Sequence, residues 1–516
     1  MDAARAVDDT VVVTRGGVVR GRDDGRAISW KGIRYARPPV GALRWRAPVE
    51  AEPWAQPLDA VTFGAASPQR PNPAVPLGPD TVMDEDCLFL NVWRPAAPAE
   101  DARPVMVWIH GGAYTFGSAS QPLFNGTTLV ADGDVVLVTI NYRTGALGFL
   151  DLTGHATPQQ PFDSNLALRD VLLALAWVRD NIAAFGGDPE RVTVFGESAG
   201  GGILTALLAT DAASGLFHRA IIESSPATSM YGTDRSRTVA DRFLAAAGVS
   251  TDEVDRLRTL NVEAIVDAAM TVYADIPSEF PGTLAFAPVI DGELLREAPI
   301  TALRNGRGLP VPLLIGTNKD EATLFKFMKS PLMPIKGEAI DTMFENMRAD
   351  NPGLEAPTRE QVLDAYETVR HRTLGLGIAT DIGFRMPTVW LAEGHSRVAP
   401  TYLYRFDFTT PMLKLIGIGA AHATELPYVW GNLTSAPKDP TFKLGGYRAG
   451  VEVSKRIRAR WTGFAHGGEP DAPGSPWPAF DEGSRATLTV GRADRVVDDL
   501  DRELRGGWGD RVLAFR

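Results

Sequence analysis

The sequence of 516 residues contains a single cysteine, Cys87. One thiol cannot form an intrachain disulfide, so the fold cannot depend on the cross-links that stabilise many secreted proteins. A composition this poor in cysteine is typical of a reducing compartment. Residues 1–9 also lack the apolar core of a signal peptide. We therefore expect a cytoplasmic protein.

Long apolar runs and an excess of positive charge are also lacking. The apolar run at 171–177 lies between two arginines and is far shorter than the roughly 18 residues that a membrane span requires. Lysine and arginine total 52, against 63 aspartates and glutamates, which gives a net charge of −11. This balance argues against nucleic acid or an anionic membrane surface as a partner. No repeat or low-complexity linker divides the chain, and we expect one domain over residues 1–516.

Short runs of β-branched and apolar residues recur along the chain. Six runs are predicted to form strands, residues 105–109, 135–140, 192–195, 220–222, 311–315 and 401–406. Several are apolar almost throughout, as are strands buried on both faces. A helix is predicted over residues 165–185, before a Gly-Gly-Asp-Pro stop. The alternation predicts an α/β fold with a large, mainly parallel sheet and helices on both faces.

Two segments, near residues 228–282 and 325–388, interrupt this rhythm with apolar-rich helical sequence. Ligands bind beyond the carboxyl ends of the strands in open α/β sheets. We interpret the two segments as insertions that cover this end of the sheet. Ordinary peripheral helices would give the same pattern.

Residues 196–200 (Gly-Glu-Ser-Ala-Gly) join a predicted strand to a helix-forming segment. A Gly-x-Ser-x-Gly motif has only three fixed positions and occurs by chance in about one chain in three of this length. The location of the motif between strand and helix therefore carries the argument. A sharp strand-to-helix turn projects its tip residue, and Gly196 and Gly200 let neighbouring backbone pass close by. We predict that Ser198 is a nucleophile. A solvent-exposed serine in a glycine-rich turn is the alternative.

A serine nucleophile requires an imidazole base and a carboxylate that orients the imidazole. Among the seven histidines, His422 lies in a loop of small residues after the last predicted strand. It follows Ser198 in the chain order Ser, acid, His of this kind of fold. The acid should follow an intervening strand, and the fifth predicted strand leads into both Asp320 and Glu321. The two adjacent carboxylates are equivalent candidates at this point.

The first predicted strand continues into residues 110–114 (His-Gly-Gly-Ala-Tyr). Small residues let backbone amides point inward, and the oxyanion that forms during acyl transfer needs such donors. The amide of Ala199, at the positive end of the predicted helix, would complete the set. A phosphate-binding glycine loop is the alternative, but the chain has no G-x-x-x-x-G-K-[ST] motif.

Further short motifs are spread over nearly the whole chain: residues 31–36 (Lys-Gly-Ile-Arg-Tyr-Ala), 85–91 (Glu-Asp-Cys-Leu-Phe-Leu-Asn), 185–189 (Phe-Gly-Gly-Asp-Pro), 318–321 (Asn-Lys-Asp-Glu), and His422 with Glu425. Together with the serine motif and the His-Gly-Gly-Ala loop, they resemble bacterial members of the type-B carboxylesterase/lipase family, which are cholinesterase-like α/β-hydrolases.

The resemblance implies a serine hydrolase that needs no metal and no organic cofactor. It implies Ser198, Glu321 and His422 as the catalytic residues, and so selects Glu321 over Asp320. The oxyanion donors that it implies are the backbone amides of Gly112, Ala113 and Ala199.

The sequence departs from the family pattern in three places. Cys87 occupies a position that is disulfide-bonded in secreted members, Ala423 replaces a usual glycine after the histidine, and residues 223–226 (Glu-Ser-Ser-Pro) replace a frequent Ser-Gly-Ser pattern. No departure removes a catalytic group, but the last puts the acyl pocket in doubt.

We therefore predict a carboxylic-ester hydrolase that acts through an acyl-enzyme on small to medium uncharged esters, with water as the second substrate. Activity should rise with pH as the imidazole loses its proton, around 6.5 if the site leaves it unperturbed. Hydrolysis of amides or carbamates by the same site is the first alternative, and a non-catalytic cholinesterase-like binding module is the second. The sequence does not indicate the oligomeric state. Apolar residues expected near the pocket, or equally in the core or a lid, are Phe325, Phe327, Met328, Leu332, Met412, Leu413 and Leu415.

Overall fold

The computed structural model describes residues 8–330, 332–333, 337–350, 359–369, 374–434, 439–472 and 475–513. In this part of the chain the main sheet has eleven strands, in the order β16-β15-β14-β13-β10-β9-β7-β8-β6-β4-β3. The seven neighbouring strands from β15 to β8 are parallel. The outer strands β16, β6, β4 and β3 pair antiparallel. The predicted α/β fold with a mainly parallel sheet is confirmed.

Every predicted strand overlaps one strand of this sheet. The strands of the main sheet are β3 (Arg22–Asp23), β4 (Ala27–Arg34), β6 (Phe89–Pro95), β7 (Arg103–Ile109), β8 (Val136–Ile140), β9 (Gly187–Glu197), β10 (Arg219–Glu223), β13 (Leu313–Asn318), β14 (Thr401–Phe406), β15 (Thr487–Val490) and β16 (Arg495–Val497). A small sheet contains β1 (Val11–Thr14), β2 (Gly17–Arg20) and β5 (Leu58–Asp59), and β11 (Tyr231–Gly232) pairs with β12 (Val289–Ile290).

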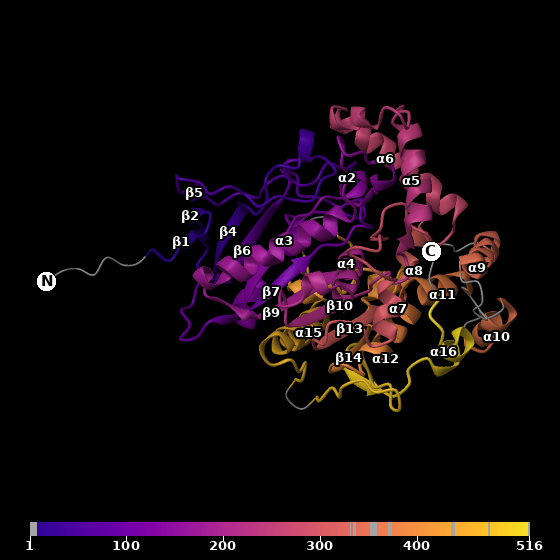
Figure 1. Cartoon of the computed structure of the whole chain (residues 1–516). Coiled ribbons are helices and arrows are strands. Elements are labelled where there is room, and N and C mark those ends of the chain that lie inside the picture. The colour runs from indigo at the N-terminus through magenta and orange to yellow at the C-terminus, as the bar shows by residue number, and fades with distance from the viewer. Residues whose placement is uncertain are drawn as a thin grey trace.

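Helices cover both faces of the main sheet because alternate side chains of each strand point to opposite sides. In β7, Val105, Val107 and Ile109 pack in one core with α3 (Leu166–Asn181) and α4 (Ala199–Leu208). Met106 and Trp108 pack in a second core. The helices on that side are α1 (Thr127–Gly133), α14 (Leu426–Trp430) and α15 (Tyr447–Gly467). Figure 1 shows α3 lying across the strands.

The predicted helix at 165–185 is confirmed as α3 followed by a short 3-10 turn, Ile182–Phe185. Gly186 ends it with a φ of +82°, a left-handed conformation that glycine adopts without strain. Further short α-helices outside the two predicted insertions are α2 (Gly145–Phe149), α7 (Pro299–Arg304), α13 (Pro411–Leu415) and α16 (Arg502–Trp508).

The two predicted insertions are helical where the structure describes them. The first contains α5 (Thr233–Ala246) and α6 (Val262–Glu279), which pack against each other. The second contains the end of α8 (Ala322–Phe327), α9 (Gly337–Asp350), α10 (Arg359–Val369), α11 (Leu374–Thr380) and the start of α12 (Met386–His395). These helices gather at the right side of Figure 1, beyond the strands. Residues 331, 334–336, 351–358 and 370–373 of the second insertion lie outside the described residues.

No helix in the described ranges combines the length and the apolar character that crossing a membrane requires.

Candidate functional site

Ser198 lies at the tip of the predicted strand-to-helix turn. β9 ends at Glu197 and α4 begins at Ala199, and Ser198 between them has φ 55° and ψ −122°. This backbone conformation is strained for a residue with a side chain. Gly200 makes the turn possible, since a Cβ at this position would lie 2.0 Å from the carbonyl oxygen of Ile109. The turn therefore projects the serine hydroxyl beyond the sheet.

The side chains of Ser198, His422 and Glu321 form a hydrogen-bonded row. The hydroxyl oxygen of Ser198 lies 2.8 Å from Nε2 of His422, and Nδ1 of His422 lies 2.7 Å from Oε2 of Glu321. The second oxygen of Glu321 accepts hydrogen bonds from the Ser224 hydroxyl and from the backbone N–H of Asn318, each at 2.6 Å. These bonds fix the carboxylate, which in turn fixes the orientation of the imidazole.

Three segments far apart in the chain meet at this row. Ser198 follows β9, Glu321 follows β13, and His422 lies in the loop after β14. The carboxyl ends of parallel strands lie at the same edge of a sheet. Residues that follow different strands can therefore meet there although they are far apart in the chain. The carboxylate of Asp320 accepts a hydrogen bond from the Ala420 amide at 3.1 Å instead. Of the two adjacent candidates, Glu321 is the one beside the imidazole.

Glu197, which the sequence analysis did not single out, also contacts the imidazole. Its Oε1 lies 3.2 Å from Nε2 of His422. Burial raises the pKa of Glu197 to about 7, although the attraction of His422 opposes this. Burial lowers the pKa of His422, but Glu197 and Glu321 more than offset this, so the pKa lies above its usual 6.5. A glutamate at the end of a buried strand, next to the nucleophile, was the available signal.

Two more buried carboxyl groups lie near the row. Burial raises the pKa of Glu223 to about 8, although the indole N–H of Trp461 donates a hydrogen bond to its carboxyl group at 2.6 Å. Burial, reinforced by Glu197 and Glu223, also raises the pKa of Glu425 well above its usual value. The raised pKa of Glu223 means that this group keeps its proton at neutral pH.

The loop after β7 passes close to Ser198, since a Cβ on Gly111 of this loop would lie 3.1 Å from the Cβ of Ser198. Gly112 and Ala113 have φ values of +122° and +52°, so the backbone of this loop is left-handed at two successive residues. Within the described part of the chain, the amides of Gly112, Ala113 and Ala199 donate no hydrogen bond to another protein group. The ring of His110 supports this loop by stacking on Tyr142 at 4.3 Å between ring centroids. Burial lowers the pKa of His110 to about 4, so the ring is neutral.

An apolar cavity adjoins Ser198. The Phe384 ring lies 4.7 Å from the His422 ring, and the Phe325 ring lies 5.2 Å from it, measured between centroids. Both aromatic rings shield the imidazole from solvent. Both insertions or their flanks contribute to the lining, which includes Tyr114, Pro226, Leu284, Phe325, Leu332 and Phe384.

The apolar residues predicted near the pocket divide into two groups. Phe325 and Leu332 line the cavity. Phe327 and Leu415 are instead 64% and 72% exposed, and Leu413 packs in a separate small cluster. Met328 and Met412 do not line the cavity either. These five residues lie outside the pocket, an alternative that the sequence left open, because α8 and α13 are too short for their sequences to reveal which side faces inward.

Ala423, which replaces a usual glycine, has a φ of +63°. This left-handed conformation costs a residue with a Cβ about 1–2 kcal/mol. The loop beside His422 therefore keeps the backbone shape that favours glycine, at a cost in stability.

Cys87 is buried, and burial raises the pKa of its thiol. In the ranges that the structure describes, no group of three histidine, cysteine, aspartate or glutamate side chains is arranged to hold a metal ion.

The mainly parallel sheet, the strained serine at a strand-to-helix turn, and the imidazole and carboxylate after later strands define a protein of the α/β-hydrolase class. Comparison with known proteins specifies the family. The sequence profile of the carboxylesterase family matches residues 8–505. The chain belongs to this family and is a carboxylesterase.

The similarity to individual proteins extends over almost the whole chain. It is 38% identical to the para-nitrobenzyl esterase of Bacillus subtilis (strain 168), over 96% of this chain and 97% of that protein. It is 32% identical to the phenmedipham hydrolase of Pseudarthrobacter oxydans, over 93% and 94% of the two chains. The crystal structure of a Geobacillus stearothermophilus carboxylesterase is similar with a TM-score of 0.84 and 35% identity, over 97% of this chain and 100% of that one.

Proposed function

We propose that this carboxylesterase uses Ser198 as its nucleophile, His422 as its general base and acid, and Glu321 as the group that orients the imidazole. The observation that carries the proposal is the 2.8 Å contact between the Ser198 hydroxyl and Nε2 of His422, aligned with the 2.7 Å contact between Nδ1 and Glu321. Such a row lets imidazole take the serine proton as the hydroxyl attacks an ester carbonyl.

The proposed reaction has two halves. In the first, Ser198 attacks the ester carbonyl, His422 accepts the serine proton and then gives it to the departing alcohol, and an acyl-enzyme remains. In the second, His422 takes a proton from water as the water attacks the acyl group, and then gives this proton to the serine oxygen as the acyl–oxygen bond breaks, which releases the acid product and regenerates Ser198.

The amides of Gly112, Ala113 and Ala199 are the proposed donors to the oxyanion of both tetrahedral intermediates. Their freedom from other protein acceptors in the described chain supports this role. One such donor typically contributes about 10²–10³ in rate. Because the donors are backbone groups held by the fold, they need little reorganisation during the reaction.

The proposed substrates are small to medium uncharged esters. The lining of the cavity supports this choice, since apolar and aromatic side chains such as Leu284, Phe325 and Phe384 form most of it. A charged acyl or alcohol group would lose its hydration in such surroundings without gaining a partner.

A fluorophosphonate probe and the Ser198→Ala variant test the proposal. The native protein should be labelled at Ser198, and the variant should lose labelling and nearly all turnover of p-nitrophenyl butyrate. Ser454→Ala, which removes a buried hydroxyl that donates to the Tyr428 carbonyl at 2.7 Å, is the matched control and should retain activity. Labelling or near-normal turnover of Ser198→Ala would exclude Ser198 as the nucleophile.

A panel of esters, anilides and carbamates that share one acyl group tests ester preference. Faster turnover of the carbamates or anilides would favour the alternative activities of the same site. A cytoplasmic location and a bacterial source remain predictions from the sequence.

A further inference from the structure

One wall of the apolar pocket lies on an irregular turn of helix. α11 ends at Thr380, α12 begins at Met386, and Asp381–Arg385 (η7) between them form a turn of π-helix. Such turns are rare and occur frequently at functional sites. Ile382, Gly383 and Phe384 of this turn line the cavity beside Ser198.

Two charged residues of the π turn, both with little exposed surface, connect it to the end of the chain. Arg385 forms ion pairs with Asp381 in the same turn and with Asp501, which directly precedes α16. Asp501 also accepts a hydrogen bond at 2.7 Å from Arg405 of β14. Arg405 binds both carboxylate oxygens of Asp407, at 2.6 and 2.8 Å. A chain of alternating charges therefore runs from the pocket wall to the sheet and the C-terminal segment.

Aromatic residues make a second connection between the π turn and α16. The indole N–H of Trp508 donates to the hydroxyl of Tyr366 at 3.0 Å, and this hydroxyl donates to the carboxylate of Asp381. The Phe344 ring of α9 stacks on Trp508 at 5.9 Å between centroids. The π turn is thus held from the side opposite to the cavity.

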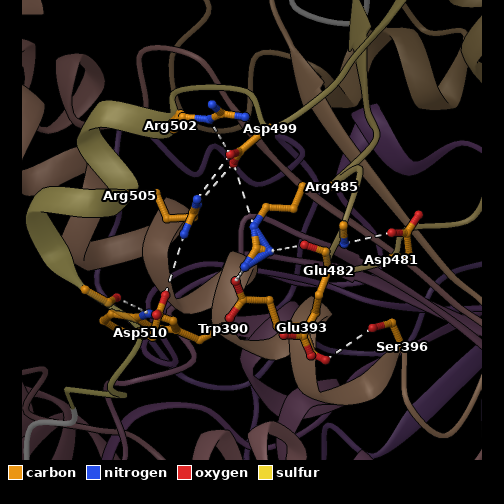
Figure 2. Close-up of polar contacts among 12 residues, drawn as sticks. Trp390, Glu393, Ser396, Asp481, Glu482, Arg485, Asp499, Arg502, Arg505 and Asp510 are labelled. Carbon is orange, nitrogen blue, oxygen red and sulfur yellow. Dashed lines mark hydrogen bonds and ion pairs between the residues drawn. The ribbon is translucent and has the colours of Figure 1, made fainter.

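A separate ionic cluster connects α12 to the C-terminal segment about two helical turns farther along (Figure 2). Glu393 lies between Arg485 at 2.9 Å and Arg304 at 2.8 Å. Arg485 also faces Asp499 at 3.7 Å, and Asp499 accepts a hydrogen bond from Arg505 at 3.1 Å. None of these five residues lines the cavity. The cluster joins the same parts of the fold without touching the pocket.

We propose that Arg385 and Asp501 are positioning residues that set the size of the substrate pocket by holding the π turn, and with it Phe384, against His422. The proposal rests on the esterase function proposed above. A π turn contains one residue more than an α-helical turn needs, and it persists only where its surroundings hold it. Without the ion pair, relaxation to a regular helix changes the register by one residue, or about 100° around the axis.

Such a rotation moves the Phe384 ring away from the imidazole and enlarges the pocket. Small acyl groups then lose contact with the wall, whereas long acyl groups gain room. Each methylene that gains or loses a well-formed contact changes the ratio of kcat/KM between two substrates by about tenfold or more. The pair Arg385–Asp501 should therefore control acyl-chain preference although neither residue lines the cavity.

Kinetics on p-nitrophenyl acetate, butyrate and octanoate test this role in Arg385→Met and Asp501→Asn. Titration with a fluorophosphonate probe gives the concentration of active sites, so that kcat and KM refer to folded enzyme only. Arg385→Lys keeps the charge and should retain most of the wild-type preference. Arg485→Met breaks the ionic cluster of Figure 2, which holds α12 through Glu393, and is the matched control for loss of stability.

The octanoate-to-acetate ratio of kcat/KM should rise about tenfold in Arg385→Met and in Asp501→Asn, mainly through a higher KM for acetate. Arg485→Met should lower the temperature of unfolding and leave this ratio at the wild-type value. An unchanged ratio in labelled Arg385→Met or Asp501→Asn, or an equal rise in Arg485→Met, would refute the proposal. A wild-type protein that the probe fails to label would instead refute the proposed serine chemistry, and this proposal with it.

Discussion

Replacement of Glu197 by glutamine should weaken catalysis and extend activity to lower pH. Two unit charges 3.2 Å apart, the distance from Glu197 to Nε2 of His422, attract by about 5 kcal/mol at an effective dielectric of about 20. The attraction is greatest when His422 carries its proton in the transition state. The carbonyl dipole of glutamine keeps part of the attraction to protonated His422. The variant also avoids the cost of burying a carboxylate in the free enzyme, which further reduces the net loss. We therefore expect a net loss of about 1.4–2.8 kcal/mol, or 10- to 100-fold in kcat/KM.

The same change has a definite sign in the pH profile. Burial lowers the pKa of His422, while Glu197 and Glu321 raise it to a net value above 6.5. Loss of the Glu197 charge therefore lowers the pKa of His422. Because neutral imidazole is the active base, the acid limb of kcat/KM should move to lower pH. The loss of rate should be largest above pH 7, since the pKa of Glu197 is about 7 and its carboxyl group is ionised there.

A pH series from 5 to 9 with p-nitrophenyl butyrate, corrected for active sites by probe titration, measures both effects. Glu190→Gln is the matched control, because Glu190 lies on the same strand, β9, and its side chain is 84% exposed. The control should reproduce the wild-type profile. An acid limb that stays in place or moves to higher pH in Glu197→Gln would refute the electrostatic role assigned to this carboxylate.

Three further predictions concern stability and access. The pKa of Glu223 is about 8 against an ordinary 4.5, so between these values the folded protein keeps a proton that the unfolded chain loses. The free energy of unfolding should therefore fall by up to about 1.4 kcal/mol per pH unit in this range. Urea unfolding of Glu223→Gln at several pH values should show a smaller dependence on pH by this amount. Gly200→Ala places a Cβ 2.0 Å from the Ile109 carbonyl oxygen and should lower the free energy of unfolding by about 3 kcal/mol or more, as measured by thermal unfolding. A Cβ at Gly467 meets no atom within 4 Å, so the control Gly467→Ala should change stability little. Cys87, buried and with a raised pKa, should react with a disulfide reagent only after denaturation, and rapid reaction of the native protein would contradict its burial.

The sequence predicted those features that depend on local backbone chemistry. The turn at Ser198 needs Gly200 where no Cβ fits, and strands buried on both faces need short runs that are apolar almost throughout, so both leave direct marks in the sequence. Some strands escaped prediction. β4, for example, includes Lys31 and Gly32, and its burial follows no simple alternation because its pairing with β6 is irregular there.

The surroundings of the imidazole could not be predicted in the same way. Phe384 reaches His422 because of a π turn and contacts from a segment more than 100 residues later, as in the pairing of Arg385 with Asp501. Glu197 was visible within the serine motif, but its 3.2 Å contact with His422 depends on how the loop after β14 folds back. Such long-range packing has no periodic signature in the sequence.

The two margins of the main sheet have a consequence for association between copies of the chain. An unpaired outer strand offers backbone groups to which another chain can add. Here the outermost strands, Arg22–Asp23 and Arg495–Val497, are two and three residues long, and both display exposed arginine. Short charged margins of this kind resist further strand addition. The two margins of the main sheet are therefore poor sites for pairing with a second copy of this esterase.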